Sequence, residues 1–195
     1  MNARERWGLR LGILTELVER SSCKLGRTAI MKLAFLLQTL KGVPLDYNFR
    51  LYTYGPYDSD VLNDLGQAET LGAVKSKMVT YPHGYGYEFS IGPNCKVVKS
   101  FGRRELSKFN DSINWVLTEF GQRNASDLEL LSTIIYADRD ALERHQRISS
   151  DDLCRQVREI KPRFTEEFVR QQIASLAEKG LLLSMSGNVA PSSPF

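Results

Sequence analysis

The side chains best suited to chemistry gather between residues 50 and 58, where one arginine, three tyrosines and one aspartate stand at short spacing. They are Arg50, Tyr52, Tyr54, Tyr57 and Asp58. Tyrosine offers a large rigid ring with a hydroxyl and arginine a charged fork, and both residue types are enriched among those that dominate binding energy at protein interfaces. The segment holds no histidine, no cysteine and no glycine-rich phosphate loop. We therefore predict that it recognises a protein partner rather than catalyses a reaction.

The same aromatic residues also allow a purely structural interpretation. Buried tyrosines can pack beneath a neighbouring helix with their hydroxyl groups hydrogen-bonded. The sequence supports this interpretation about as well as the binding surface, so both stay open. If the residues belong to the core, truncating them should unfold the protein; if they form a surface, truncation should leave it folded.

Two carboxylates, Asp58 and Asp60, flank Ser59 directly after the turn residues Gly55 and Pro56. Paired carboxylates can act as a general acid and a general base. Acidic residues are also favoured at the beginning of a helix, where they meet the positive end of its dipole. Because a helix is predicted to begin here, helix capping is the favoured interpretation of this pair.

Histidines and cysteines are too few and too scattered to predict a metal centre. Neither His83 nor His145 has a potential ligand at the third or fourth residue after it. Cys23, Cys95 and Cys154 lie far apart without Cys-x-x-Cys spacing, which is typical of isolated reduced thiols. We therefore expect no catalytic residues, no metal and no cofactor, and an enzyme is the third-ranked class of function.

The composition is that of an ordinary water-soluble protein. Of the 195 residues, 42% are hydrophobic and 25% are charged. No apolar run approaches the roughly 20 residues of a membrane span, and no signal-peptide core follows the N-terminus, so we expect a cytoplasmic protein with no membrane partner. The net charge is +3, and residues 1–50 carry nine Lys or Arg against four Asp or Glu. That basic segment could meet nucleic acid or an acidic protein, although a solvated helix face explains it more simply.

Hydrophobic spacing predicts the elements that position the aromatic segment. Amphipathic helices are expected over residues 3–20 and from Thr28 to Gly42, the second with a wide, buried apolar face. Period-two alternation predicts a strand from Asn48 to Tyr54 that Gly55-Pro56 breaks, followed by a helix that ends before Gly72. Two further strands, 73–80 and 85–91, flank the hairpin residues Pro82-His83-Gly84, and both could pair with the 49–53 strand in one small sheet.

The C-terminal part has the order of a winged helix. A helix over 105–120 ends at Gly121, and a capping box at Ser126 precedes helices 126–143, 150–160 and 165–179 and a short hairpin around Gly187-Asn188. In a DNA-binding version the 165–179 helix would enter the major groove. Its leading residues Glu166 and Glu167 would repel phosphate, so packing or protein contact is favoured for this part.

These elements predict an α+β fold that is predominantly α, with a small antiparallel sheet and a winged-helix-like C-terminal part. The expected division is residues 1–121, mixed helix and sheet, and residues 122–195, mainly helical. No long linker separates them. A single shared core is therefore at least as well supported as two independent ones.

Several short sequence motifs resemble those of the YwgA-like family of prokaryotic proteins. They are Lys32-Leu33, Phe35 to Gln38, Phe49 to Tyr57, Leu62-x-Asp64-Leu65, Asp127 to Leu131 and Lys161 to Thr165. The first part, residues 1–121, is also similar, through shorter words, to SocA-like or Panacea antitoxin domains. The first resemblance implies chiefly a fold. The second implies a protein that binds another protein, as an antitoxin or a proteolytic adaptor, and neither brings catalytic residues.

The predicted function is thus a non-enzymatic protein-interaction module that resembles antitoxin or adaptor domains. Its expected partner is a protein, with a toxin among the candidates. The alternative is a winged-helix DNA-binding transcriptional regulator, for which nucleic acid would be the partner. The sequence leaves the oligomeric state and the identity of the partner open.

Overall fold

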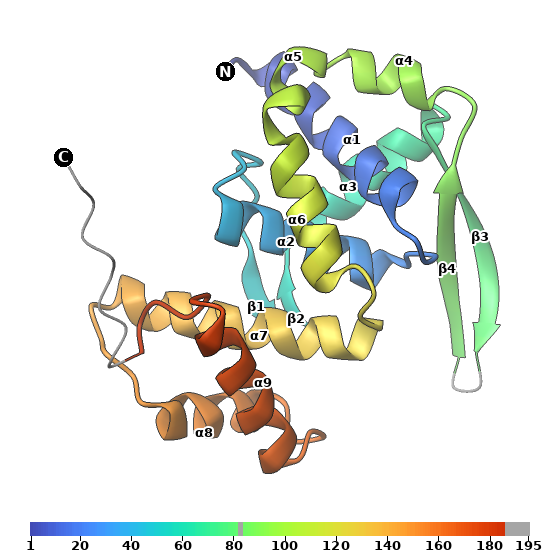
Figure 1. Ribbon diagram of the computed structural model, residues 1–195. Helices are drawn as coiled ribbons and strands as arrows, with labels where there is room; N and C mark the ends of the chain where they lie inside the picture. The colour runs from blue at the N-terminus through green and yellow to red at the C-terminus, as the bar shows by residue number, and fades with distance from the viewer. Residues whose placement is uncertain (82–83, 186–195) are drawn as a thin grey trace. The chain divides into compact units, whose positions relative to one another are not determined.

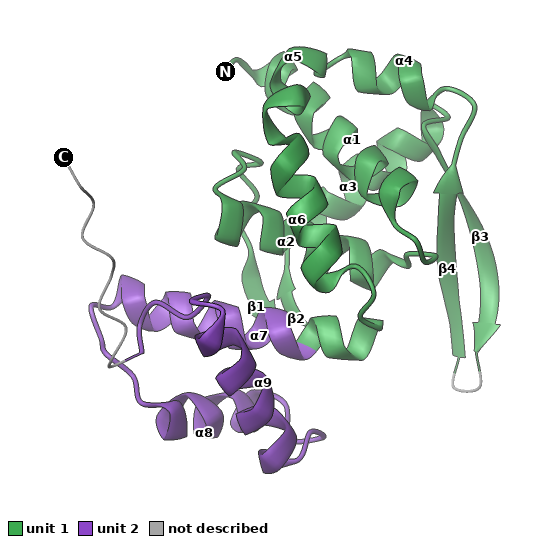
Figure 2. Ribbon diagram, in the orientation of Figure 1, with its two compact units in different colours: residues 1–129 green, residues 130–195 purple. Residues whose placement is uncertain are grey.

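The computed structural model describes residues 1–81 and 84–185, which form two compact units. Unit 1 comprises residues 1–129 and unit 2 residues 130–195 (Figure 2). The described chain is mostly helical and contains two small antiparallel sheets, which confirms the predicted α+β class. The sequence suggested a division after Gly121, whereas the units divide after Glu129. The helix α7 (Ala125–Glu143) begins in unit 1 and continues into unit 2.

Unit 1 is built around its first helix, α1. Asn2 and Glu5 form a capping box at its beginning, and the helix ends at Arg20 as its apolar spacing predicted. Leu9, Leu14 and Leu17 of α1 are fully buried. Figure 1 shows α1 in the middle of the unit, in contact with α3 and α6. The elements of unit 1 are α1 (Ala3–Arg20), α2 (Arg27–Lys41), β1 (Arg50–Tyr52), β2 (Gly55–Tyr57), α3 (Ser59–Thr70), β3 (Val74–Tyr81), β4 (Gly84–Ile91), α4 (Cys95–Ser100), α5 (Arg103–Leu106), the 3₁₀ turn η1 (Ser107–Phe109), α6 (Asn110–Phe120) and the start of α7.

The second helix differs from the prediction only at its beginning. Its N-cap is Gly26, in an extended conformation and without a side-chain hydrogen bond, so the expected cap Thr28 instead lies within the first turn. Its end agrees with the prediction: Gly42 has φ +62°, the left-handed conformation that glycine adopts at low cost. Residues Ala29 to Leu37 are buried, as the wide apolar face required.

The predicted single sheet is wrong. β3 and β4 pair along their whole length, from Val74 opposite Ile91 to Tyr81 opposite Gly84, and confirm the second hairpin. In the described residues, however, β1 pairs with β2 and not with this ribbon. The chain reverses after Tyr52, and Gly55 at φ +82° begins a return strand where the sequence suggested only a break. The expected turn residues 82 and 83 lie outside the described residues.

The predicted helix 105–120 is also interrupted. It is divided into α5, η1 and α6. The Ser107 hydroxyl donates to the Arg104 carbonyl at 3.0 Å, a local bond that competes with regular helical pairing. Leu106, Ile113 and Val116 still face the core, because the break leaves the apolar stripe in place.

Helix capping decides where the later helices begin. The expected cap Ser126 is wrong: the Asn124 side chain accepts from the Asp127 backbone at 2.9 Å, so α7 starts at Ala125. Ser149 caps α8 (Ser150–Ile160) and Thr165 caps α9 (Glu166–Glu178), so both helices begin within one residue of the predicted positions 150 and 165. The hairpin suggested around residues 187–188 lies outside the described residues, so the winged-helix detail stays a prediction.

Unit 2 has its own core and an internal anchor. Apolar residues of α8 and α9, among them Leu153, Val157 and Ile173, are buried where the two helices pack. The fully buried Asp138 of α7 accepts hydrogen bonds from the backbone of Leu183 and from the backbone and hydroxyl of Ser184. This carboxylate holds the chain that follows α9 against α7.

Candidate protein-binding site

The predicted aromatic segment forms a short two-stranded ribbon in unit 1. Arg50 stands opposite Tyr57, and Tyr52 stands opposite Gly55. Because directly opposed residues share a face of an antiparallel pair, Arg50, Tyr52 and Tyr57 lie on one face of the ribbon. The Tyr52 and Tyr57 rings meet edge to face, with centroids 5.4 Å apart. The ribbon therefore brings together residues that the sequence only placed near one another.

Exposure separates the two interpretations of these residues. Tyr52 is 59% exposed and Tyr54, in the turn, is 65% exposed. The Arg50 side chain is exposed as well, and within residues 1–81 and 84–185 it makes no hydrogen bond, ion pair or ring contact. Tyr57 is half-buried beneath Tyr52. Arg50, Tyr52 and Tyr54 thus belong to the surface, and the core interpretation does not apply to them.

Helix α2 holds this ribbon from behind through three side chains on its buried and half-buried faces. Lys32, only 2% exposed, donates from Nζ to the Pro56 carbonyl at 2.6 Å. Phe35 meets the Phe49 ring edge to face at 5.2 Å. The Gln38 amide accepts from the Tyr47 backbone N–H at 3.0 Å and donates to its carbonyl at 2.8 Å. These contacts hold Pro56 of β2 and the chain that enters β1, so the face of the ribbon opposite α2 is presented on a fixed support.

Asp58 closes the ribbon at its base. One carboxylate oxygen accepts from the Asp60 backbone N–H at 2.8 Å and caps α3, and the other accepts from the Asn48 backbone N–H. Both oxygens are therefore used by the fold. The favoured capping interpretation is confirmed for Asp58, and a catalytic pairing with Asp60 has no geometric support, because the Asp58 carboxylate meets the Asp60 backbone rather than its carboxyl.

A buried polar cluster lies behind the same segment. The Tyr47 hydroxyl donates to Asp64 Oδ2 at 2.8 Å, and the Arg10 guanidinium lies 3.7 Å from that oxygen and over the Tyr47 ring. Burial raises the pKa of the Asp64 carboxyl, although Tyr47 and Arg10 partly oppose the shift. Burial, together with the Asp64 charge, also raises the pKa of Tyr47 well above its ordinary value. The cluster ties α1, α3 and the chain before β1 together.

Sequence reasoning missed most of this support. Lys32, Gln38 and Asp64 were noted only as letters of the family resemblance, and Arg10 and Tyr47 were not singled out. Lys32 and Gln38 did carry a signal, because they are the polar residues that interrupt the long apolar run of α2. A polar group inside an apolar helix face must find a partner, and here each finds the backbone of the ribbon segment.

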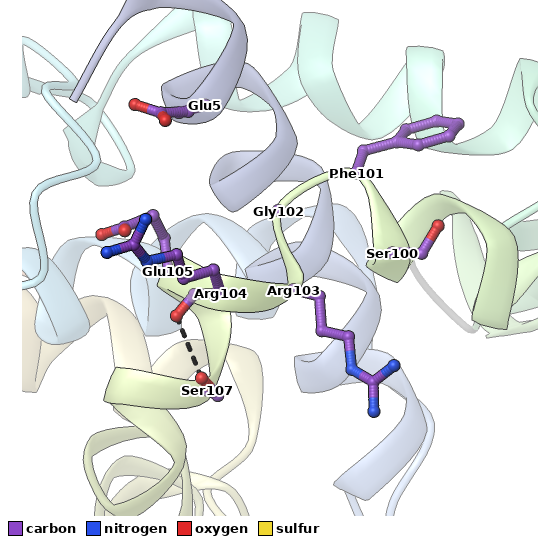
Figure 3. A pocket seen from close by; sticks show the side chains of 8 residues that line it. All are labelled: Glu5, Ser100, Phe101, Gly102, Arg103, Arg104, Glu105 and Ser107. Atoms are coloured by element: carbon purple, nitrogen blue, oxygen red, sulfur yellow. Dashed lines mark hydrogen bonds between the residues drawn. The ribbon is translucent and has the colours of Figure 1, made fainter.

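A pocket of about 550 Å³ lies where the chain between α4 and α5 crosses α1. Gly102 packs on Gly8 so closely that a Cβ on either glycine would lie 2.7 Å or less from backbone atoms. Figure 3 shows that the side chains around it spread apart: Arg103 points away from Arg104 and Glu105. Phe101 lies apart from all three, and its ring stacks on Trp7. The charged groups do not converge on one point, so the pocket is explained by close helix packing.

The alternative site, the outer face of α9, is neutralised within unit 2. Arg170 pairs with Asp151 and with Glu166, and Arg158 also lies 3.5 Å from Glu166. The hydrogen bonds that Arg170 donates to these carboxylates raise the pKa of Arg170 above its ordinary value, with Asp151 the larger contributor. Of the two acidic residues that the sequence placed at the start of this helix, Glu166 is thus engaged with its arginine.

The cysteines and histidines that the sequence analysis considered form no site of their own in the described residues. Cys23, Cys95 and Cys154 are free thiols, and His145 is exposed in a turn with φ +56°, while His83 lies outside the described residues. In residues 1–81 and 84–185, no three His, Cys, Asp or Glu residues are grouped as metal ligands. No helix of the described chain is long and apolar enough to cross a membrane.

Comparison with known proteins adds no relative. No model of a protein family matches the chain, and no curated protein matches it. The resemblance to YwgA-like proteins and to SocA-like or Panacea domains therefore stays a prediction, and the geometry of the ribbon is the basis for inferring function.

Proposed function

We propose that the protein is a cytoplasmic, non-enzymatic interaction module that binds another protein through the outer face of the β1–β2 ribbon. The observation that carries the proposal is the combination of exposure and anchoring. Tyr52 and Tyr54 are mostly exposed, Arg50 has no partner in the described chain, and the ribbon beneath them is fixed by Lys32 and Asp58. Rigid, exposed tyrosines with an available arginine match the composition of binding hot spots.

Anchoring favours binding because it lowers the entropy lost when a complex forms. A tyrosine on a loose loop would have to be ordered by its partner, whereas Tyr52 is already packed on Tyr57. The similarity to antitoxin or adaptor domains points to the same class of function, with Asp58 as a supporting residue of the surface. A toxin encoded next to this protein is the first candidate partner.

A winged-helix DNA-binding regulator is the second candidate. The order of α7, α8 and α9 favours it. The pairing of Arg170 with Asp151 and Glu166 weighs against it, because a recognition helix needs cations that can reach phosphate. We therefore rank it below the interaction module.

Site-specific photocrosslinking in cells tests the proposed surface. A photoreactive benzoylphenylalanine in place of Tyr54 should give one discrete heavier product with the partner. The same group in place of Val97, an exposed apolar residue of α4, is the matched control and should give none. Adding Arg50→Ala to the position-54 variant should abolish the product. Products that appear equally at positions 54 and 97, or no product at position 54, contradict the proposal.

A further inference from the structure

A groove of about 700 Å³ lies in unit 1, away from the β1–β2 ribbon. Its walls come from three segments that are distant in sequence: the chain entering α2, the loop after α6, and β4 with the end of β3. The Phe89 backbone N–H donates to the Leu25 carbonyl. This hydrogen bond joins β4 to the chain that enters α2. Figure 1 shows the β3–β4 ribbon standing beside the start of α2.

The groove carries positive charge without compensation. Lys24, Arg27 and Arg123 line it, and none of the described lining residues is acidic. In the described chain, the Lys24 and Arg123 side chains make no hydrogen bond, ion pair or ring contact. Arg27 lies over the Tyr87 ring, with its guanidinium carbon 3.8 Å from the ring centroid. An anionic ligand would therefore displace no internal ion pair of these three residues.

Aromatic rings follow the same groove. Tyr85 is 77% exposed and has no ring partner among the described residues. Tyr81 borders the groove, but the register places its ring on the other face of the β3–β4 pair, over Gly86 and with its hydroxyl 3.4 Å from Glu88. Tyr87, beneath Arg27, continues the series toward α2. Gln122 and Asn124 add amide groups on the opposite wall. The groove thus places the free ring face of Tyr85 beside cations and neutral polar groups.

We propose that this groove binds an extended single strand of nucleic acid, a property beyond the proposed protein-binding function. Sequence-tolerant single-strand sites combine a basic groove that follows the phosphates with aromatic side chains on which bases stack. Lys24, Arg27 and Arg123 supply the first feature, and Tyr85, followed by Tyr87 on the same face of β4, supplies the second. An acidic peptide would satisfy the cations but would leave the exposed Tyr85 face without a planar partner, so the aromatic rings favour nucleic acid.

Fluorescence anisotropy of a short labelled oligothymidylate with the full-length protein tests the proposal. We expect saturable binding at about 50 mM salt, and a log–log salt dependence with a slope near −2 for three phosphate contacts. Tyr85→Ala should weaken binding at least about fivefold, whereas Tyr85→Phe, which keeps the ring, should bind like wild type. Replacing Lys24 and Arg123 together by glutamine should reduce the slope to about −0.7.

Tyr54→Ala is the matched control, because it removes an equally exposed tyrosine from the other ribbon and should leave oligonucleotide binding unchanged. Three results would overturn the inference: no saturable binding, equal affinity of wild type and Tyr85→Ala, or displacement of the oligonucleotide by polyglutamate at equal charge concentration. The last would assign the groove to acidic peptides. None of these results bears on crosslinking at position 54, so the two proposals fail independently.

Discussion

The two units carry similar kinds of charged residues but use them differently. In unit 2, arginines on the helix surfaces are paired: Arg144 with Asp140, Arg155 with Asp152, and Arg170 with Asp151 and Glu166. Unit 1 also holds ion pairs, such as Arg6 with Asp46 and Arg20 with Glu16. It differs in that Arg50 and the groove residues Lys24 and Arg123 have no side-chain partner in the described chain and lie near exposed tyrosines.

This difference teaches where a partner should bind. Paired surface charges contribute little to stability and must be separated before they can meet a ligand. Unpaired cations beside rigid aromatic rings are available without that cost, and aromatic residues and arginine are the types that concentrate binding energy. We therefore expect the binding functions of the protein to reside in unit 1.

The largest expected effect is on partner binding. Tyr54→Ala or Arg50→Ala should weaken the complex by about 2 kcal/mol or more, close to 30-fold, because each removes a hot-spot type of side chain. Arg155→Ala in unit 2, the matched control, should change the affinity by no more than about twofold, since its exposed ion pair is worth little. Titration calorimetry with the crosslinked partner measures both. Equal losses of partner affinity for the unit 1 variants and for Arg155→Ala would contradict the inference that the partner binds unit 1.

The support of the ribbon should show the next largest effect, on stability. Lys32→Met keeps the length of the side chain but leaves the buried Pro56 carbonyl without its donor, so we expect a loss of about 1–3 kcal/mol in the free energy of unfolding. Lys75→Met, on an exposed strand position without a partner, is the control and should stay within about 0.5 kcal/mol. Denaturant unfolding measures both variants. Equal stability of the two would mean that Lys32 does not anchor the ribbon.

Sequence alone gave the elements of this support but not their assembly. The apolar stripes located α1, α2, α8 and α9 because burial follows helical periodicity, and the beginnings of α8 and α9 were predicted to within one residue because capping is local. The pairing of β1 with β2 was missed, because it depends on a reversal after Tyr52 and a positive φ at Gly55 that local alternation does not reveal.

The candidate site shows the same limit. The sequence identified Arg50, Tyr52 and Tyr54 as recognition residues, but it could not decide between surface and core, because exposure is set by what α2 and α3 cover. Gly26, Gln122 and Tyr85 line one groove only because segments distant in sequence meet there. No spacing rule along the chain predicts such a meeting.

The buried cluster behind the ribbon should make stability depend on pH. Burial raises the pKa of Asp64, so the folded protein holds this proton more tightly than the unfolded chain, whose aspartates titrate near about 3.9. The stabilisation is complete below the unfolded value and is lost as pH rises through the raised folded value. Asp64→Asn mimics the protonated form and keeps an acceptor for Tyr47.

Relative to wild type, the Asp64→Asn variant should therefore gain stability as pH rises above about 4, and the gain should level off once pH passes the raised folded pKa of Asp64. Thermal melts at several pH values in this window give the difference in melting temperature. A constant or shrinking difference would show that the Arg10 ion pair outweighs burial.

The exposed tyrosines should matter little for folding. Tyr52→Ala and Tyr54→Ala should each change the free energy of unfolding by no more than about 0.5 kcal/mol, as is usual at the surface. Tyr57→Ala, which removes the half-buried ring beneath Tyr52, should cost more than either. Thermal melts of the three single variants rank them. A large drop in melting temperature for Tyr54→Ala would show that Tyr54 contributes to the core, and would contradict the distinction between the outer and inner faces of the segment.

The smallest expected effect concerns duplex DNA and the charges of unit 2. Arg170→Ala should leave duplex affinity within about twofold and the salt dependence unchanged, because this arginine is already neutralised by Asp151 and Glu166 and contributes no free phosphate contact. Asp151→Asn combined with Glu166→Gln is the opposite variant: it frees Arg170 and should strengthen non-specific duplex binding.

Anisotropy titration against the promoter of the protein's own gene measures duplex affinity for wild type and both variants. Nanomolar, sequence-selective binding at physiological salt that Arg170→Ala abolishes would show that the ion pairs open for DNA, and would promote the regulator over the interaction module. Weak binding that rises only in the charge-freed variant would show that unit 2 keeps its arginines away from phosphate by pairing them.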